Sequence, residues 1–341
     1  MSESARTHLP LVVWIVIDNK PGHVNQSLGL AGALARATTT EIHTLPALPA
    51  WRAWLALLLK RAPDNALPAP DLIIGAGHAT HLTLLAARRA CGGRSVVMMK
   101  PSLPRHWFDL CIVPQHDGVA AEAHTLVTEG ALNRIRASNT LNPNQGLILI
   151  GGVSPHFAWD SDAVQVQIRS ILVRTPEVHW TLTTSRRTPT DFLAQLPAAA
   201  NLDIVTHTVT SPDWLPGQLT QCGTVWVTPD SASMVYEALT AGADVGVFDL
   251  PVNPKSRVGR AIAKLADVQR ITRFMNWCAH DKLHPNTQPL AEADRCADWI
   301  VETYFGKNML PVVTPAKAGV TILRISTGRI NSLYQWLKKK N

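Results

Sequence analysis

Short apolar runs rich in β-branched residues alternate with longer segments of helical periodicity along most of this 341-residue chain. Such alternation is typical of βαβ units, which build parallel sheets covered by helices, so it predicts an α/β fold. The expected strands are residues 9–17, 71–75, 95–99, 109–113, 146–150, 178–183, 203–206, 224–228 and 245–248. The expected helices are residues 25–36, 51–61, 79–91, 161–173, 191–196, 231–241, 258–266 and 290–305.

The length of the chain predicts two domains, because a single hydrophobic core usually stops growing at roughly 250–300 residues. The turn-rich segment 142–145 precedes the apolar run 146–150, and we place the boundary between them. The expected organisation is one Rossmann-like domain over residues 1–145, a second over residues 146–305 and a basic extension over residues 306–341.

The formal net charge of +7 belongs to the end of the chain. Seven Lys or Arg and no acidic residue follow Glu302, and the remaining 25 basic and 25 acidic residues balance. This neutral body has no nucleic-acid signature, so nucleic acid is not an expected partner. Tyr334, Trp336 and Leu337 beside lysines 338–340 resemble an interfacial anchor, which predicts peripheral membrane contact through the extension. A solvated end is the alternative.

Cysteine usage and the apolar runs indicate where the protein resides. The five cysteines are an odd number without a CxxC pair, so we expect neither a disulfide framework nor a zinc site. The apolar stretch 9–17 has only the length of a strand and ends at Asp18, so neither a signal peptide nor a membrane span is expected. The sequence predicts a cytoplasmic protein, with peripheral contact at the inner membrane as a further possibility.

The loop after the first expected strand combines polar groups and a glycine. Ligands of parallel α/β sheets bind outside the carboxyl ends of the strands, where this loop would lie. We expect Asp18, Lys20, Gly22, His23 and Gln26 to contribute to a binding site there, with Gly22 allowing close backbone approach. The structural alternative is that Asp18 and Gly22 only shape a turn and that Gln26 is solvated.

Two further loops of the first half place imidazoles at the same edge. Gly77 and His78 follow the strand 71–75, and His116 and Asp117 follow the strand 109–113. A tight turn explains the glycine equally well. Three histidines from three strand ends could bind a metal, but their spacing matches no ligand motif, so general-base or hydrogen-bonding roles are favoured.

Loops of the second half suit a diphosphate. Gly152 and Ser154 follow the strand 146–150, and Ser185, Arg186 and Arg187 follow the strand 178–183. The guanidinium group of arginine matches phosphate oxygens with a planar fork of donors. A solvated basic turn is the alternative interpretation.

The segment 225–242 has the pattern of a strand followed by a helix, with an N-cap residue at the start of the helix and a glycine directly after its end. Asp230 or Ser231 could cap the helix, and Ser231 and Ser233 could meet phosphate at its N-terminus. Glu237 lies one turn beyond Ser233, where its carboxylate could accept both ribose hydroxyls. The alternative is that Glu237 lies on a solvated helix face.

The chain contains, in this order, the motifs Asn19-Lys-Pro-Gly-His-Val-Asn-Gln-Ser27, Pro114-Gln-His-Asp117, Thr184-Ser-Arg-Arg-Thr-Pro189 and Asp230-Ser-Ala-Ser-Met234. Together these motifs resemble the mitochondrial-fission-ELM-like family over roughly residues 10–305. The family comprises a plant mitochondrial fission factor and bacterial homologues, and it is similar in organisation to glycosyltransferase B enzymes, whose two Rossmann-like domains face a cleft. Pro229 departs from the family pattern, in which an acidic residue is commoner, and the basic tail lies outside it.

The resemblance implies a nucleotide-sugar site, with Ser185, Arg186, Arg187, Ser231, Ser233, Met234 and Glu237 on the donor side and His23 and Gln26 on the acceptor side. We expect an inverting, metal-independent glycosyltransferase that needs no cofactor beyond its donor and acts on an envelope glycan or glycolipid. His23 or Asp18 is the expected base and Asp117 the next candidate. A nucleoside-diphosphate-sugar epimerase and a noncatalytic recruitment protein are the alternatives.

Overall fold

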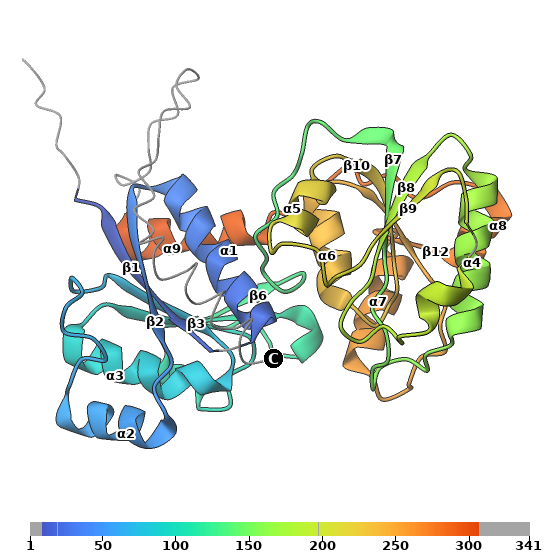
Figure 1. The fold of residues 1–341 in the computed structure, drawn as a ribbon. Helices are drawn as coiled ribbons and strands as arrows, with labels where there is room; N and C mark the ends of the chain where they lie inside the picture. The colour runs from blue at the N-terminus through green and yellow to red at the C-terminus, as the bar shows by residue number, and fades with distance from the viewer. Residues whose placement is uncertain (1–8, 19, 197, 307–341) are drawn as a thin grey trace, which may run out of the picture. The chain divides into compact units, whose positions relative to one another are not determined.

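The computed structural model describes residues 9–18, 20–196 and 198–306, which divide into two compact units (Figure 1). The first unit comprises the described residues up to Arg134 and those from Glu292 onward, and the second comprises Ile135–Ala291. The expected boundary after residue 145 is wrong, because that position falls inside strand β7 (Asn142–Leu149). The closing helix α9 (Glu292–Phe305) was expected in the second domain and belongs to the first unit.

The first unit is built on a six-stranded parallel sheet in the order β2-β1-β3-β4-β5-β6. Its central strands are apolar and fully buried, as strands covered by helices on both faces must be. The strands are β1 (Leu11–Ile17), β2 (Thr40–Pro46), β3 (Leu72–Ala76), β4 (Arg94–Met98), β5 (Leu110–Pro114) and β6 (Thr125–Thr128).

Alternate side chains of these strands face two cores, because successive residues of a strand point to opposite faces. Val13 and Ile15 pack with α1 (Pro21–Ala37) and α9 on one face. Trp14 and Val16 pack on the other face with α3 (His81–Cys91), and α2 (Ala50–Leu59) lies against α3.

The second unit has its own six-stranded parallel sheet in the order β12-β11-β10-β7-β8-β9. One face packs against α4 (Ser161–Arg174) and α8 (Phe274–His280). The other face packs against α5 (Trp214–Leu219), α6 (Ala232–Ala241) and α7 (Arg257–Asp267). The remaining strands are β8 (His179–Thr183), β9 (Leu202–Val205), β10 (Cys222–Val227), β11 (Asp244–Val247) and β12 (Thr272–Arg273).

Every expected strand is present, and the structure adds β2, β6 and β12. All three additions lie at an edge of a sheet, where a strand buries less apolar surface and its hydrophobic signal is weak. The expected helix 191–196 is a short 3-10 turn, η4 (Phe192–Gln195). Helices α5 and α8 were not expected. Among the described residues, no helix combines the length and the apolar character needed to cross a bilayer.

The order of strands defines one switch point in each sheet. In the first unit the chain passes from β1 outward to β2 and resumes on the other side of β1 with β3. In the second unit it runs outward through β8 and β9 and resumes beside β7 with β10. Crevices at the carboxyl ends of such strand pairs are where open α/β sheets bind ligands. The two places to search are therefore the loops after β1 and β3 and those after β7 and β10.

Candidate functional site

Asp18 and His23 form a hydrogen-bonded pair at the switch point of the first unit. Asp18 directly follows β1, and His23 lies in the first turn of α1, which begins at Pro21 rather than at the expected residue 25. Asp18 Oδ2 is 2.8 Å from His23 Nδ1, and Asp18 Oδ1 accepts a hydrogen bond from the Lys20 N–H group at 3.1 Å. A neutral imidazole that donates from Nδ1 keeps a lone pair on Nε2, so this pair can act as a general base.

Gly77, after β3, makes room for this imidazole. Its φ of +81° lies in the left-handed region, and a Cβ atom at this position would be 2.3 Å from His23 Cε1. The Gly77 carbonyl accepts a hydrogen bond from Thr80 Oγ1 at 2.8 Å, which fixes the turn. The glycine expected from the local turn is therefore also required by a side chain from α1.

His81 lies behind this turn at the start of α3 and is 2% exposed. Its ring packs edge-on against Phe108, and its Nδ1 lies 3.3 Å from Ser102 Oγ. Burial, together with the neighbouring His78, lowers the pKa of His81 to about 4. The ring is therefore neutral at pH 7, while His78 itself is exposed.

His116 and Asp117 lie elsewhere on the same edge. They belong to the 3-10 turn η3 (Gln115–Asp117) after β5, and β4 separates β5 from β3. At roughly 4.8 Å per strand, the end of β5 is about 10 Å from that of β3. In the structure His23 therefore lies against Gly77, whereas His116 and Asp117 follow a strand that is two positions farther along the sheet than β3. Among the described residues, no three His, Cys, Asp or Glu side chains form a group that could hold a metal ion.

The other expected residues of the first loop differ in exposure. Lys20 is exposed and precedes α1 as its N-cap residue. Gly22 lies within α1, and a Cβ atom there would meet nothing within 4 Å, so no described residue of the protein requires this glycine. Gln26 is buried in α1. Asn19, where the first family motif begins, lies outside the described residues.

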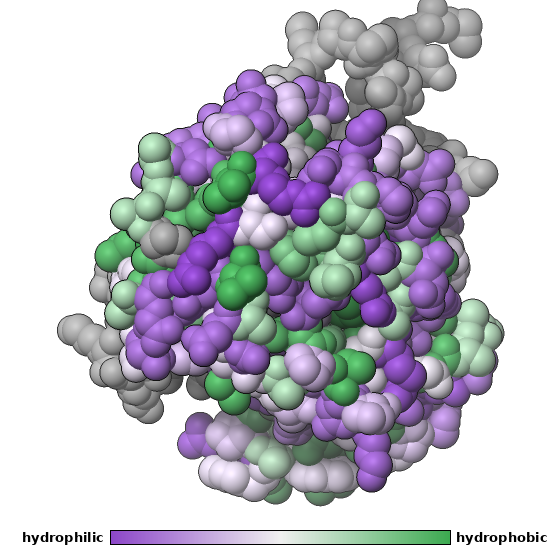
Figure 2. All heavy atoms as spheres, turned by 90° about the vertical axis from the view of Figure 1, so that its right-hand side faces the viewer, coloured by the Kyte–Doolittle hydropathy of each residue, from purple (hydrophilic) through white to green (hydrophobic). Residues whose placement is uncertain are grey.

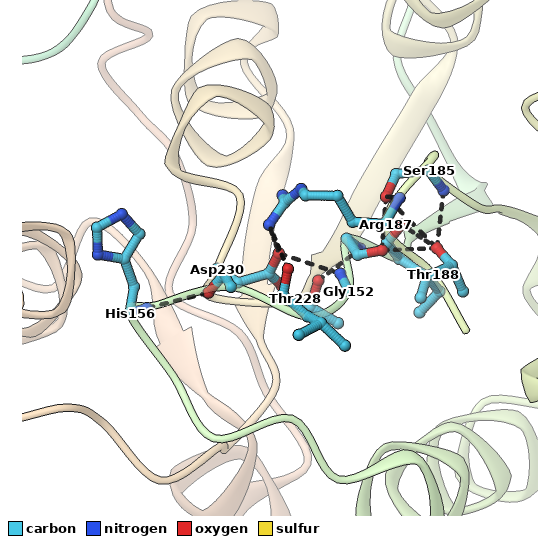
Figure 3. A network of polar contacts seen from close by, with 11 residues as sticks. Gly152, His156, Ser185, Arg187, Thr188, Thr228 and Asp230 are labelled. Carbon is cyan, nitrogen blue, oxygen red and sulfur yellow. Dashed lines mark hydrogen bonds and ion pairs between the residues drawn. The ribbon is translucent and has the colours of Figure 1, made fainter.

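In the second unit, the carboxylate of Asp230 lies at the centre of a polar network (Figure 3). Asp230 Oδ2 is 2.8 Å from Nη1 of Arg187 and accepts a hydrogen bond from the Gly152 N–H group at 3.1 Å. The Asp230 side chain is only 1% exposed, and among the described residues its Oδ1 atom has no hydrogen-bond partner. Burial raises the pKa of this carboxyl, although Thr228, Arg187 and Gly152 act in the opposite direction.

The loop that carries the two arginines is held against the end of β7. Ser185 Oγ and Thr188 Oγ1 each donate a hydrogen bond to the Gly151 carbonyl at 2.6 Å. A Cβ atom at Gly152 would be 2.0 Å from the Arg187 carbonyl oxygen, so only glycine fits there. Arg186 is exposed and forms no hydrogen bond or ion pair with any described residue.

The N-terminus of α6 lies beside this loop, as the Arg187–Asp230 ion pair shows. Ser231 is the N-cap residue, but its hydroxyl makes no capping hydrogen bond. Its carbonyl accepts hydrogen bonds from the N–H groups of Met234 and Val235, which leaves those of Ala232 and Ser233 without a partner among the described residues. Unpaired N–H groups and the helix dipole make such an end a site for anions.

Three other expected residues of the second unit differ in their surroundings. Ser154 Oγ accepts a hydrogen bond from the His156 N–H group at 3.2 Å. Met234 packs partly against the hydrophobic core. Glu237 lies one turn beyond Ser233 but is only 9% exposed, so the alternative of a solvated helix face is wrong.

Sequence reasoning missed the central position of Asp230, which was expected only as a helix cap. It also missed Gly151, Thr188 and Thr228, which complete the network. No local pattern could reveal them, because the ion pair joins loops that follow two different strands, β8 and β10. Parallel sheet topology, in which β7 lies between β8 and β10, is the only signal that brings these loops together.

Comparisons with solved structures show the fold. A protein from Listeria monocytogenes assigned as a UDP-N-acetylglucosamine 2-epimerase superposes with a TM-score of 0.54 at 11% identity, over 87% of this chain and 97% of that one. The glycotransferase of kitacinnamycin superposes with a TM-score of 0.50 at 13% identity, over 86% of this chain and 99% of that one. The expected glycosyltransferase B type of fold, with two parallel α/β domains, is confirmed.

Comparisons of sequence show the family. An uncharacterised protein of Rickettsia prowazekii (strain Madrid E) is 32% identical over 114 residues, which are 31% of this chain and 32% of that protein. This chain therefore matches about a third of the length of that relative. Residues 21–304 match the family described as Mitochondrial fission ELM1, which is most of the chain and agrees with the resemblance seen in the motifs. The chain belongs to the mitochondrial fission ELM1 family.

Proposed function

We propose that the protein is a nucleotide-sugar-dependent glycosyltransferase whose second unit binds the donor diphosphate at the N-terminus of α6. The proposal rests on two observations: among the described residues the N–H groups of Ala232 and Ser233 have no partner, and the loop beside this helix end carries the exposed Arg186, which also has none. Both features favour an anion, and both lie at the switch point of the sheet.

The surroundings of this anion site suit a nucleoside diphosphate. Gly151 and Gly152 let the Asp230 carboxylate and the backbone of Arg187 pack against the end of β7, which fixes the loop of Arg186 beside the start of α6. The hydroxyls of Ser231 and Ser233 can donate to phosphate oxygens. Glu237, one turn farther along α6, is the proposed acceptor of the ribose hydroxyls.

In the proposed reaction, Nε2 of His23 takes the proton of an acceptor hydroxyl while Asp18 holds Nδ1 and stabilises the imidazolium that forms. The acceptor oxygen attacks the anomeric carbon of the donor sugar, and the bond from that carbon to the diphosphate oxygen breaks. This single displacement inverts the anomeric centre. Arg186 and the α6 N–H groups stabilise the departing diphosphate without need of a metal. Asp117 remains the alternative base, and an envelope glycan or glycolipid is the proposed acceptor.

A thermal-shift panel of nucleotides and nucleotide sugars, followed by turnover assays, tests the proposal. A donor at about 100 times its dissociation constant should stabilise the protein by roughly 2.7 kcal/mol. The stabilising nucleotide sugar is then incubated with and without glycolipid acceptors. Release of nucleoside diphosphate that depends on acceptor supports transfer. Interconversion of the sugar without acceptor would instead indicate an epimerase, and a protein that no nucleotide stabilises would fit a recruitment role.

A further inference from the structure

Helix α2 has its large apolar side chains on the outside. Its two buried residues, Ala53 and Ala56, are small, and both face the body of the first unit. The exposed side chains are 47–64% accessible and cover about 140° of the helix circumference. These residues, which we name the α2 face, are Trp51, Trp54, Leu55, Leu58 and Leu59. A surface helix of a soluble protein normally has the opposite arrangement.

The α2 face differs from the rest of the described surface. Other large apolar residues that are exposed, such as Val173 and Met275, belong to different elements. Figure 2 shows a face of the second unit on which hydrophobic residues lie in small groups separated by hydrophilic ones. Isolated apolar residues of that kind are ordinary, whereas a contiguous apolar patch marks an interaction site. In Figure 1, α2 lies alongside α3 at the outer side of the first unit.

The charged residues on α2 and directly after its last turn are all positive. Arg52 lies on the helix and stacks over the Trp51 ring at 5.1 Å, and Lys60 and Arg61 follow its last turn. Between Glu41 and Asp64 the chain contains no acidic residue. Apolar residues that include tryptophan, bordered by arginine and lysine, are the composition of helices that lie in the interface of an anionic bilayer.

We propose that the α2 face docks onto an anionic lipid surface, with its tryptophan and leucine side chains in the interface and its basic residues against lipid headgroups. A second copy of the chain fits the face less well. Two α2 helices packed together would bring basic residues of both copies close to one another, and the segment 42–63 that contains α2 has no acidic residue to pair with them. A helix of ten residues is only about 15 Å long, which is small for the roughly 800 Å² that each partner buries in a stable dimer.

Sedimentation of the full chain with vesicles tests this proposal. The vesicles are pure phosphatidylcholine or an equal mixture of phosphatidylcholine and phosphatidylglycerol. The apolar variant is Trp54→Gln/Leu58→Gln, and its matched control is Val173→Gln/Met275→Gln in the second unit, where both side chains are also exposed. The charge variant is Arg52→Gln/Arg61→Gln, with Arg260→Gln/Lys264→Gln on α7 as its control.

The wild type and both controls should sediment with the anionic vesicles. The apolar variant should bind the anionic vesicles at least about tenfold more weakly than the wild type. The charge variant should lose binding to the anionic vesicles, and its binding to pure phosphatidylcholine should equal that of the wild type. Sedimentation of the apolar variant at the wild-type level would overturn the proposal. Complete loss of vesicle binding on deletion of residues 311–341 would also overturn it. A third contrary result would be a wild type that binds no vesicles but forms a dimer, which the apolar variant converts to monomer. Nucleotide binding by the apolar variant should be unchanged, which separates this test from that of the proposed function.

Discussion

Arg186 and Arg187 are adjacent in sequence but differ in their surroundings. Arg187 is 42% exposed and forms an ion pair with the buried carboxylate of Asp230, whereas Arg186 has no partner among the described residues. A sequence in which two arginines follow a strand does not reveal which one is bound internally. The structure therefore gives Arg187 a positioning role and leaves Arg186 as the arginine that we propose to bind the ligand.

Replacing Arg187 should destabilise the second unit. In Arg187→Ala the buried carboxylate of Asp230 loses its cationic partner, which we expect to lower the free energy of unfolding by about 1–3 kcal/mol. Urea unfolding measures the effect, with Arg186→Ala as the matched control that keeps wild-type stability. Adding Asp230→Asn to Arg187→Ala should restore part of the loss, because the amide carries no charge to bury. Equal stability of the two single variants would show that the ion pair has no structural role.

His81 should make the stability of the first unit depend on pH. Its pKa is about 4 in the folded protein and about 6.5 in the unfolded chain, so the unfolded chain binds a proton more readily between these values. The contribution of the neutral His81 ring to the free energy of unfolding is fully present above pH 6.5. It is lost as the pH falls toward 4, and the loss is about 3 kcal/mol at most. The measurement is the difference in unfolding free energy between the wild type and His81→Gln at pH 4–7. A difference that stays constant over this range would contradict the assignment.

At the scale of elements, α6 combines the proposed anion site at its start with the Glu237 carboxylate one turn later. Glu237→Gln should weaken the binding of a nucleoside diphosphate by about 1.5–3 kcal/mol, because the amide replaces charge-assisted hydrogen bonds to the ribose hydroxyls. Binding of inorganic pyrophosphate, which lacks ribose, should not change. Titration calorimetry with both ligands gives the answer. Parallel losses for the two ligands, or none for either, would remove Glu237 from the ribose site.

The elements that the sequence predicts correctly are those whose signal is local. Central strands such as β1, β3 and β10 are continuous apolar runs, and each expected strand is present. Edge strands β2, β6 and β12 carry a weaker pattern and were missed. The candidate site shows the same difference. Asp18, His23 and Arg187 were expected because they lie in loops that follow strands, but the residues that they contact depend on which strands are neighbours in the sheet. Neither the His23–Gly77 contact nor the Arg187–Asp230 pair has a spacing that a single sequence reveals.

At the scale of the whole molecule, the first unit is discontinuous in sequence. Helix α9 returns from the end of the second unit to the first, where Ala297, Ile300 and Val301 pack with α1 and the sheet. The sequence places α9 after the second domain, and periodicity alone cannot tell which core its apolar face covers. The error in the expected domain boundary has this cause.

Truncation after Ala291 should therefore unfold the first unit and spare the second. The cut removes the buried Ile300 and Val301 as well as Trp299, Tyr304 and Phe305, which are partly buried against the same core. A large apolar side chain contributes about 1.5–3 kcal/mol when it is fully buried. The total is comparable with the stability of a typical domain. Urea unfolding followed by circular dichroism should show that about half of the native structure is lost, since the second unit retains its own core. An unfolding curve like that of the full chain would contradict the assignment of α9 to the first unit.

Deleting residues 311–341 is the matched control and a prediction in its own right. These residues make up most of the basic extension, 306–341, that was expected to contact membranes, and they lie outside the described part of the chain. The four motifs and the described residues of the hydrophobic clusters all precede them. The melting temperature and the binding of nucleotides should stay at their wild-type values. A fall of several degrees in the melting temperature would mean that the extension belongs to one of the folded units.

The proposed function requires that the N-terminus of α6 and Arg186 bind the diphosphate of a nucleotide. Titration calorimetry tests it, with uridine, guanosine and adenosine diphosphate injected in turn into the wild type, Arg186→Ala and Arg89→Ala. Arg89 is an exposed arginine on α3 of the other unit, so its variant matches the loss of charge. At least one nucleotide should bind the wild type and Arg89→Ala equally and bind Arg186→Ala about ten- to a hundredfold more weakly. Failure of all three nucleotides to bind, or equal affinity in Arg186→Ala and the wild type, would contradict the claim.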